Sequence, residues 1–161
     1  MEIRRATPDE AHALTALAHA AKRYWGYPEA FIRLWKRDLT FTPEFIEKHP
    51  VYAAVHRGDL IGVVALSLNR TTCELEHLWV APERIGTGLG RRLLTKAVRL
   101  AKSVGAQRLE IASDPNAEVF YLRMGAQRIG YVPSLPQGRK LPKLVIRLDK
   151  RPSRANLSRR S

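Results

Sequence analysis

Three glycines in alternating positions constrain the fold of this chain more than any other feature. Gly86, Gly88 and Gly90 follow an apolar run that ends at Val80, and they lie at the junction with a strongly periodic segment that predicts a helix over residues 88–104. Glycine lets the backbone turn with unusual dihedral angles and approach a ligand closely. The free N–H groups at the start of the helix would point at one site, where the helix dipole favours an anion.

Arginines beside the glycines strengthen this prediction of an anion site. Arg84 precedes the first glycine, and Arg91 and Arg92 follow the last one, so a diphosphate or similar group would meet positive charge as well as N–H groups. Two well-known phosphate loops do not match. No lysine follows as in NTPase loops, and the spacing differs from the Gly-x-Gly-x-x-Gly of dinucleotide-binding folds. The alternative is a glycine-rich turn with only structural meaning.

Hydrophobic periodicity over the rest of the chain predicts a mixed sheet with helices on its faces. The expected strands cover residues 2–6, 51–56, 60–68, 73–80, 108–112, 128–132 and 141–148. The expected helices cover residues 8–24, a segment after Pro28, a short segment opened by Thr42, and residues 88–104 and 114–124. The unit over residues 73–112 implies a parallel crossover. We therefore predict an α/β fold (a mixed α+β sheet) in one domain over residues 1–149.

Positive charge exceeds negative charge by a wide margin. The 161 residues include 28 Lys and Arg against 15 Asp and Glu, a net charge of +13, and such an excess suits an anionic partner. Five of the basic residues and none of the acidic ones lie in residues 150–161, a polar tail that we expect to be mobile. A basic nucleic-acid- or ribosome-binding module is therefore the alternative class of function, although no signature of such a module is present.

Cysteine and histidine usage argues against several kinds of site. The one cysteine, Cys73, excludes an intrachain disulfide and a cysteine-based zinc site and is compatible with a reducing compartment. The histidines lack ligand spacing, so we predict no metal. Because no segment reaches about 18 consecutive apolar residues and the N-terminus has no apolar signal core, we expect a cytoplasmic protein without a membrane span.

The glycine loop resembles the acetyl-CoA motif of the GCN5-related N-acetyltransferase (GNAT) family, Arg/Gln-x-x-Gly-x-Gly/Ala. Residues 85–90 read Ile-Gly-Thr-Gly-Leu-Gly, which keeps both essential glycines and places Ile85 where Arg or Gln is usual. A second family motif, Asn-x-x-Ala-x-x-x-Tyr-x-x-x-Gly-Phe, resembles residues 114–126. Ala117, Tyr121 and Gly125 fall in register there, whereas Asp114 replaces the Asn and Ala126 replaces the Phe.

The resemblance implies an acetyl-CoA-dependent N-acetyltransferase in which an amine attacks the thioester directly, without an acyl-enzyme. Backbone groups at residues 78–80 would hold the pantetheine arm, and the N–H of Leu78 or a close neighbour would stabilise the oxyanion. The predicted cofactor contacts are Leu78, Trp79, Val80, Ile85, Gly86, Thr87, Gly88, Leu89, Gly90, Arg91, Asp114, Ala117 and Tyr121.

Candidate catalytic residues lie on the strand before the glycines and in the second motif. Strand alternation predicts Glu74, Glu76, Leu78 and Val80 on one face, and His77 and Trp79 on the other. The resemblance makes Glu76 the first choice and Glu74 the second for a base acting through water; alternatively, these carboxylates merely pair with basic groups. It also makes Tyr121 the proton donor to the departing thiolate, and the alternative there is an aromatic anchor.

An aromatic cluster marks the predicted acceptor side. Tyr24, Trp25 and Tyr27 stand at a helix break, in a region where the family often admits its acceptor, and they could form a wall for an apolar or cationic substrate. The alternative is that they only pack a helical hairpin. We expect a primary amine as acceptor, with a small molecule favoured over a protein amine, and a monomer or homodimer.

Overall fold

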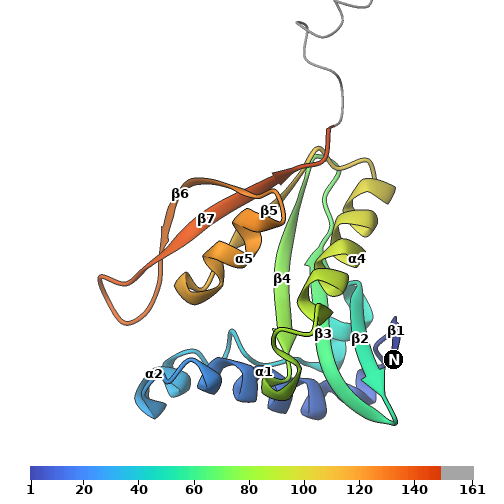
Figure 1. The fold of residues 1–161 in the computed structure, drawn as a ribbon, viewed down its shortest axis with the longest axis vertical. Coiled ribbons are helices and arrows are strands. Elements are labelled where there is room, and N and C mark those ends of the chain that lie inside the picture. The colour runs from blue at the N-terminus through green and yellow to red at the C-terminus, as the bar shows by residue number, and fades with distance from the viewer. Residues whose placement is uncertain (150–161) are drawn as a thin grey trace, which may run out of the picture.

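A seven-stranded mixed sheet organises the computed structural model, which describes residues 1–149 (Figure 1). The strand order is β1-β2-β3-β4-β5-β7-β6, and every pair is antiparallel except β4 with β5. The bounds are β1 Glu2–Arg5, β2 Val51–His56, β3 Asp59–Ser67, β4 Thr72–Val80, β5 Arg108–Ala112, β6 Gln127–Pro133 and β7 Lys140–Arg147. The predicted mixed sheet and its parallel crossover are confirmed.

Helices cover both faces of this sheet. They are α1 Ala11–Tyr24, α2 Glu29–Leu34, α3 Pro43–Lys48, α4 Leu89–Ser103 and α5 Glu118–Arg123. The apolar positions that predicted α1 and α4, among them Leu14, Leu17, Leu93 and Ala97, are buried. Short 3₁₀ turns at Pro8–Glu10 and Pro115–Ala117 precede α1 and α5, so these two α-helices begin later than the sequence predicts.

The central feature of the sheet is that β4 and β5 separate. They pair only over Thr72–Glu74 against Arg108–Glu110, and Figure 1 shows the two strands diverging beyond that point. The rest of β4, from Leu75 to Val80, has no strand partner on its β5 side among the described residues. Ligands of open α/β sheets bind beyond the carboxyl ends of such parallel strands, and the glycine loop follows the end of β4.

A β-bulge in β4 changes the predicted alternation. Ala65 of β3 pairs with His77, whereas the next residue pairs with Leu75, so Glu76 is an extra residue in β4. Glu74, which pairs with Ser67, therefore shares a face with His77. The prediction that Glu74 lies on the face of Leu78 and Val80 is wrong, because one inserted residue exchanges the two faces of a strand.

Two predictions about the chain as a whole concerned a membrane span and the basic tail. No helix within residues 1–149 combines the length and the apolar character needed to cross a bilayer. The predicted basic tail over residues 150–161 lies outside the described residues.

Candidate functional site

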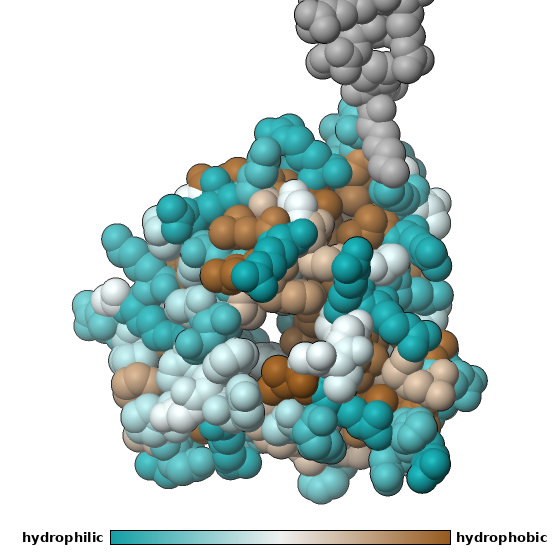
Figure 2. All heavy atoms as spheres, viewed as in Figure 1, coloured by the Kyte–Doolittle hydropathy of each residue, from teal (hydrophilic) through white to brown (hydrophobic). Residues whose placement is uncertain are grey.

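A cavity of about 680 Å³ occupies the space where β4 and β5 diverge. Its wall is built from β4, the glycine loop, the start of α4 and α5 at one end, and from α1, the segment after α2 and the β6–β7 connection at the other. In the space-filling view, a hollow opens in the middle of the face (Figure 2). Elements that are far apart in the sequence thus enclose one continuous site.

The glycine loop forms a backbone cradle at one end of the cavity. Gly86 and Gly88 have φ angles of 81° and 87°, values that favour glycine, and a Cβ at either position would meet no atom within 4 Å. Gly88 immediately precedes α4, whose first N–H groups lack helical partners. Arg84 and Arg91 line the same end. The cradle fits an anionic group such as a diphosphate.

Most of the predicted cofactor contacts lie around this cavity, and two do not. Leu89 is 3% exposed and packs in the core near Gly62, and the Thr87 hydroxyl donates a hydrogen bond to the Arg84 carbonyl. Neither side chain faces the cavity. The predicted contacts that line it are Leu78, Trp79, Val80, Ile85, Gly86, Gly88, Gly90, Arg91, Asp114, Ala117 and Tyr121.

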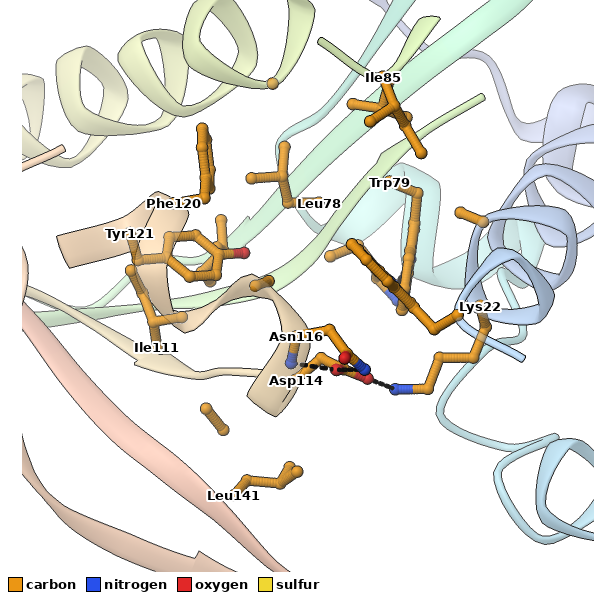
Figure 3. Close-up of a pocket in the computed structure, with 18 of the residues that line it drawn as sticks. Lys22, Leu78, Trp79, Ile85, Ile111, Asp114, Asn116, Phe120, Tyr121 and Leu141 are labelled. Carbon is orange, nitrogen blue, oxygen red and sulfur yellow. Dashed lines mark hydrogen bonds and ion pairs between the residues drawn. The ribbon is translucent and has the colours of Figure 1, made fainter. Parts of the chain in front are cut away.

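Tyr121 reaches the cavity from α5. The side chain is 6% exposed, and Figure 3 shows its hydroxyl directed into the space between α5 and β4. Burial, followed by the negative charge of Asp114, raises the pKa of this phenol above its usual range. Tyr121 is therefore protonated near neutral pH and can donate a proton.

His77 and Trp79 of β4 are fixed to each other. The Trp79 Nε1–H donates to His77 Nδ1 at 2.9 Å, and the His77 ring lies 4.1 Å from that of Phe41. Burial lowers the pKa of His77 to about 4. The imidazole is therefore neutral near pH 7, and it orients the indole of Trp79 at the cavity wall.

The two glutamates of β4 are placed differently. Glu76, at the bulge, lines the cavity and accepts a hydrogen bond from the Ser67 hydroxyl at 2.7 Å. Both glutamates are exposed, but Glu74 is not among the lining residues. Only Glu76 is therefore in a position to act on a group inside the cavity.

The predicted aromatic wall is only partly present. Trp25 lines the cavity, whereas Tyr24 packs edge-on against Trp25 with a centroid distance of 5.2 Å and does not line it. Tyr27 packs edge-on against Trp35 at 4.8 Å, and its hydroxyl donates to Asp114 at 3.0 Å. Trp35, which the sequence did not single out, provides the second indole of this wall.

A partly buried polar group closes the end of the cavity opposite the glycine loop; we call it the Asp114 cluster and define it as Lys22, Tyr27, Asp114, Asn116 and Arg139. Lys22 Nζ of α1 lies 2.5 Å from Asp114 Oδ2, a contact drawn in Figure 3. Burial opposes the charge of both partners. It lowers the pKa of Lys22, but the hydrogen bond and charge of Lys22 outweigh it at Asp114, whose pKa lies below the usual range.

Neither Lys22 nor Arg139 was predicted from the sequence, although the position of Lys22 on its helix indicates burial. Lys22 stands next to the apolar stripe of α1 and is only 8% exposed, and a lysine at such a position needs a buried partner. Arg139 lies in a Pro- and Gly-containing turn, where nothing in the pattern indicates burial. No group of three or more potential metal ligands occurs within residues 1–149.

Comparison with known proteins relates this architecture to one family. The model of the acetyltransferase (GNAT) family matches residues 13–126. A blasticidin-S acetyltransferase of Streptomyces morookaense is 28% identical over 109 residues, which are 66% of this chain and 80% of that protein.

Solved structures agree on the fold. PaiA N-acetyltransferase from Thermoplasma acidophilum, in complex with coenzyme A, has a TM-score of 0.72 at 22% identity, covering 91% of this chain and 98% of its own. Aminoglycoside 6'-N-acetyltransferase from Enterococcus faecium has a TM-score of 0.67 at 17% identity, covering 95% and 100%. Since the family model spans the described chain from α1 past α5, this protein belongs to the acetyltransferase (GNAT) family and is an acetyl-CoA-dependent N-acetyltransferase.

Proposed function

We propose that the enzyme transfers the acetyl group to a primary amine of a small molecule by direct attack, with Tyr121 as the proton donor. One observation carries the proposal. A single cavity joins the glycine cradle to a space walled by Trp25, Trp35 and Trp79, and the Tyr121 hydroxyl points into it between the two ends. Acetyl-CoA supplies the activated acyl group. The names of the blasticidin-S and aminoglycoside enzymes, which refer to small molecules, support the acceptor class.

The free edge of β4 suits the cofactor arm. Beyond Glu74 this edge has no strand partner among the described residues, so backbone N–H and C=O groups from Leu78 to Val80 are left for a ligand that runs along it. An amide-containing arm can pair with such an edge as an added strand does. An N–H of this segment, at Leu78 or a close neighbour, then lies where an oxyanion would need a donor.

The chemistry on the protein side needs a base and an acid. Glu76 lines the cavity without an ion-pair partner among the described residues, so it can accept the proton of the attacking amine through water. When the bond between the acyl carbon and sulfur breaks, Tyr121 donates its proton to the departing thiolate. Cys73, the single thiol of the chain, is fully buried in the core, which disfavours an acyl-cysteine route.

Contacts across the acceptor end favour a small substrate over a protein segment. Besides the Lys22–Asp114 ion pair, Trp35 Nε1 of the α2 region donates to the carbonyl of Leu135 at 2.8 Å. These contacts tie the first two helices to the β5–α5 and β6–β7 connections. An extended peptide would have to displace them, whereas a small amine can fit inside.

Thiol release from acetyl-CoA tests the proposal directly. We expect turnover with small primary amines, and at least about tenfold lower kcat/KM with lysine-containing and N-terminal peptides, a difference of about 1.4 kcal/mol. Acetylation of peptides alone would overturn the acceptor class. Intact-mass analysis after incubation with acetyl-CoA, without an amine, should show unmodified protein. An acetylated protein that passes its acetyl group to an added amine would overturn direct attack.

A further inference from the structure

The Asp114 carboxylate already has a full set of donors. Lys22 Nζ contacts Oδ2 at 2.5 Å and the Tyr27 hydroxyl lies 3.0 Å from the same oxygen. The backbone N–H and the side-chain amide of Asn116 both donate to Oδ1, at 2.8 and 2.9 Å. Two carboxylate oxygens offer about four acceptor positions, so the neighbours of Asp114 occupy them.

Arg139 is the member of the Asp114 cluster without a hydrogen-bonded anion. It forms a long ion pair with Asp114, at 3.8 Å, and its two hydrogen bonds go to neutral oxygens, the Ser134 and Tyr27 hydroxyls, at 3.0 and 3.1 Å. Its side chain is only 15% exposed. The other two carboxylates of the cavity wall, Asp38 and Glu76, form no ion pair with it. A largely buried guanidinium is stable only when its charge is compensated.

The guanidinium of Arg139 is also held in a fixed orientation. It lies over the Trp35 ring at 4.5 Å and over the Tyr27 ring at 5.4 Å, and both rings are packed edge-on against each other. Hydrogen bonds from two of its five N–H groups leave three for a ligand. A prepositioned guanidinium of this kind suits the planar, bidentate geometry of a carboxylate.

We propose that Arg139 binds a carboxylate of the acceptor, so that the substrate is a small molecule with both a primary amine and a carboxylate. This inference rests on the proposed function, because it names the substrate class of the same cavity. Two cations of the cluster, Lys22 and Arg139, share the single carboxylate of Asp114. The charge of Asp38 acts on Lys22 but makes no ion pair with Arg139, so a carboxylate of the acceptor would give Arg139 a direct partner. A cationic group of an acceptor would be repelled by Arg139 at the same position.

Three matched acceptor series provide the test. They are the ω-amino carboxylates of three to six carbons, their primary amides, and the alkylamines of equal length, each assayed by thiol release from acetyl-CoA. We expect kcat/KM for the best amino carboxylate to exceed that of its amide by about 10- to 100-fold, the range of a charge-assisted hydrogen bond. The optimal length reports the distance from Arg139 to the reacting centre.

Variants of the same protein separate recognition from folding. In Arg139→Gln the ratio of kcat/KM between carboxylate and amide should fall close to one, mainly through a higher KM for the carboxylate. Arg139→Lys, which keeps the charge but loses the planar fork, should be intermediate. Lys140→Gln is the matched control, because it removes a positive charge from the adjacent, exposed residue that does not line the cavity. It should retain the wild-type ratio.

The two possible failures are distinguishable. If the wild-type protein acetylates amides or alkylamines as well as amino carboxylates, or if Arg139→Gln keeps the preference, Arg139 does not bind the acceptor, and the proposed function stands. If no small amine of any series is acetylated, the proposed function fails together with this inference.

Discussion

The two ends of the cavity are constructed in different ways. The proposed cofactor end is made by backbone groups of neighbouring residues, from the free edge of β4 through the glycines to the start of α4. The proposed acceptor end is made by side chains from α1, the α1–α2 connection, the β5–α5 connection and the β6–β7 connection, which meet at the Asp114 cluster. The cradle stays intact as long as a few positions keep glycine, whereas a single side-chain substitution can change which group the acceptor end binds.

The two ends also differ in how far each group depends on its neighbours for stability. A backbone cradle needs only glycine-type conformations, and its unpaired N–H groups remain accessible to water until a ligand arrives. The Asp114 cluster places several charged and polar groups in a largely buried position, where each depends on the others. Substitutions at the first end should therefore affect cofactor affinity, and those at the second should affect both stability and acceptor choice.

The largest expected effect is at the cofactor end, in Gly88→Glu. The substitution replaces a glycine of φ 87° and places a carboxylate where the cradle offers positive charge. Losing two charge-assisted hydrogen bonds and adding repulsion should cost about 4 kcal/mol of acetyl-CoA binding, roughly 1,000-fold in affinity. Isothermal titration calorimetry measures this change.

Gly58→Glu is the control for backbone strain. Gly58 has a φ of 83°, close to that of Gly88, and lies at the β2–β3 turn with open space around it. It should lose about 1 kcal/mol of stability and bind acetyl-CoA as wild type does. Equal loss of affinity in both variants would show that strain, and not the cradle, is responsible.

At the acceptor end, Lys22→Met should mainly affect stability. Methionine fills similar space but leaves Asp114, which is about 10% exposed, without its closest cation. We expect the free energy of unfolding to fall by about 3 kcal/mol, the lower limit for breaking a buried ion pair, because Tyr27 and Asn116 still donate to Asp114. Chemical denaturation measures it. Arg23, on the same helix as Lys22, forms a surface pair with Glu29 of α2, and Arg23→Met should change the stability little. An equal loss in both variants would contradict the comparison.

His77, between the two ends, predicts a pH dependence. Its folded pKa of about 4 lies below the ordinary value of 6.5, so the unfolded chain binds a proton more readily. Stability is therefore complete above pH 6.5 and is lost as the pH falls toward 4, by at most about 3 kcal/mol. His19 contributes in the same direction. Chemical denaturation at several pH values should show that the free energy of unfolding changes less steeply with pH in His77→Gln. An unchanged slope would mean that other groups cause the pH dependence of stability.

The contrast between the ends also explains what the sequence could and could not predict. The glycine cradle and Tyr121 lie in short local motifs, and local patterns predicted every strand and the major helices to within a few residues. The Asp114 cluster joins Lys22 to Asp114 across 92 positions and Tyr27 to Arg139 across 112, and no local pattern encodes such pairs. The bulge at Glu76 was missed for a related reason. It depends on the register with β3, and alternation within one strand does not reveal it.

The smallest predicted effect concerns the proton donor where the two ends meet. Tyr121→Phe removes the hydroxyl but keeps the ring, so acetyl-CoA affinity should stay close to wild type while kcat falls. A thiol has a pKa of about 8.5, and the pKa of Tyr121 is raised above that of an ordinary phenol. Proton transfer from Tyr121 to the thiolate is therefore unfavourable, and it assists the reaction only modestly. We expect about a tenfold loss of kcat, below the usual 10²–10⁴ range for general acid catalysis.

Steady-state kinetics together with calorimetry separate this prediction from a packing defect. Tyr131→Phe is the matched control, because Tyr131 is 55% exposed on β6 and does not line the cavity. A lower acetyl-CoA affinity in Tyr121→Phe would indicate that the ring supports the cofactor end instead. An unchanged kcat would mean that the thiolate leaves without help from Tyr121, and the acid would then have to be water, since His77 is neutral and hydrogen-bonded to Trp79.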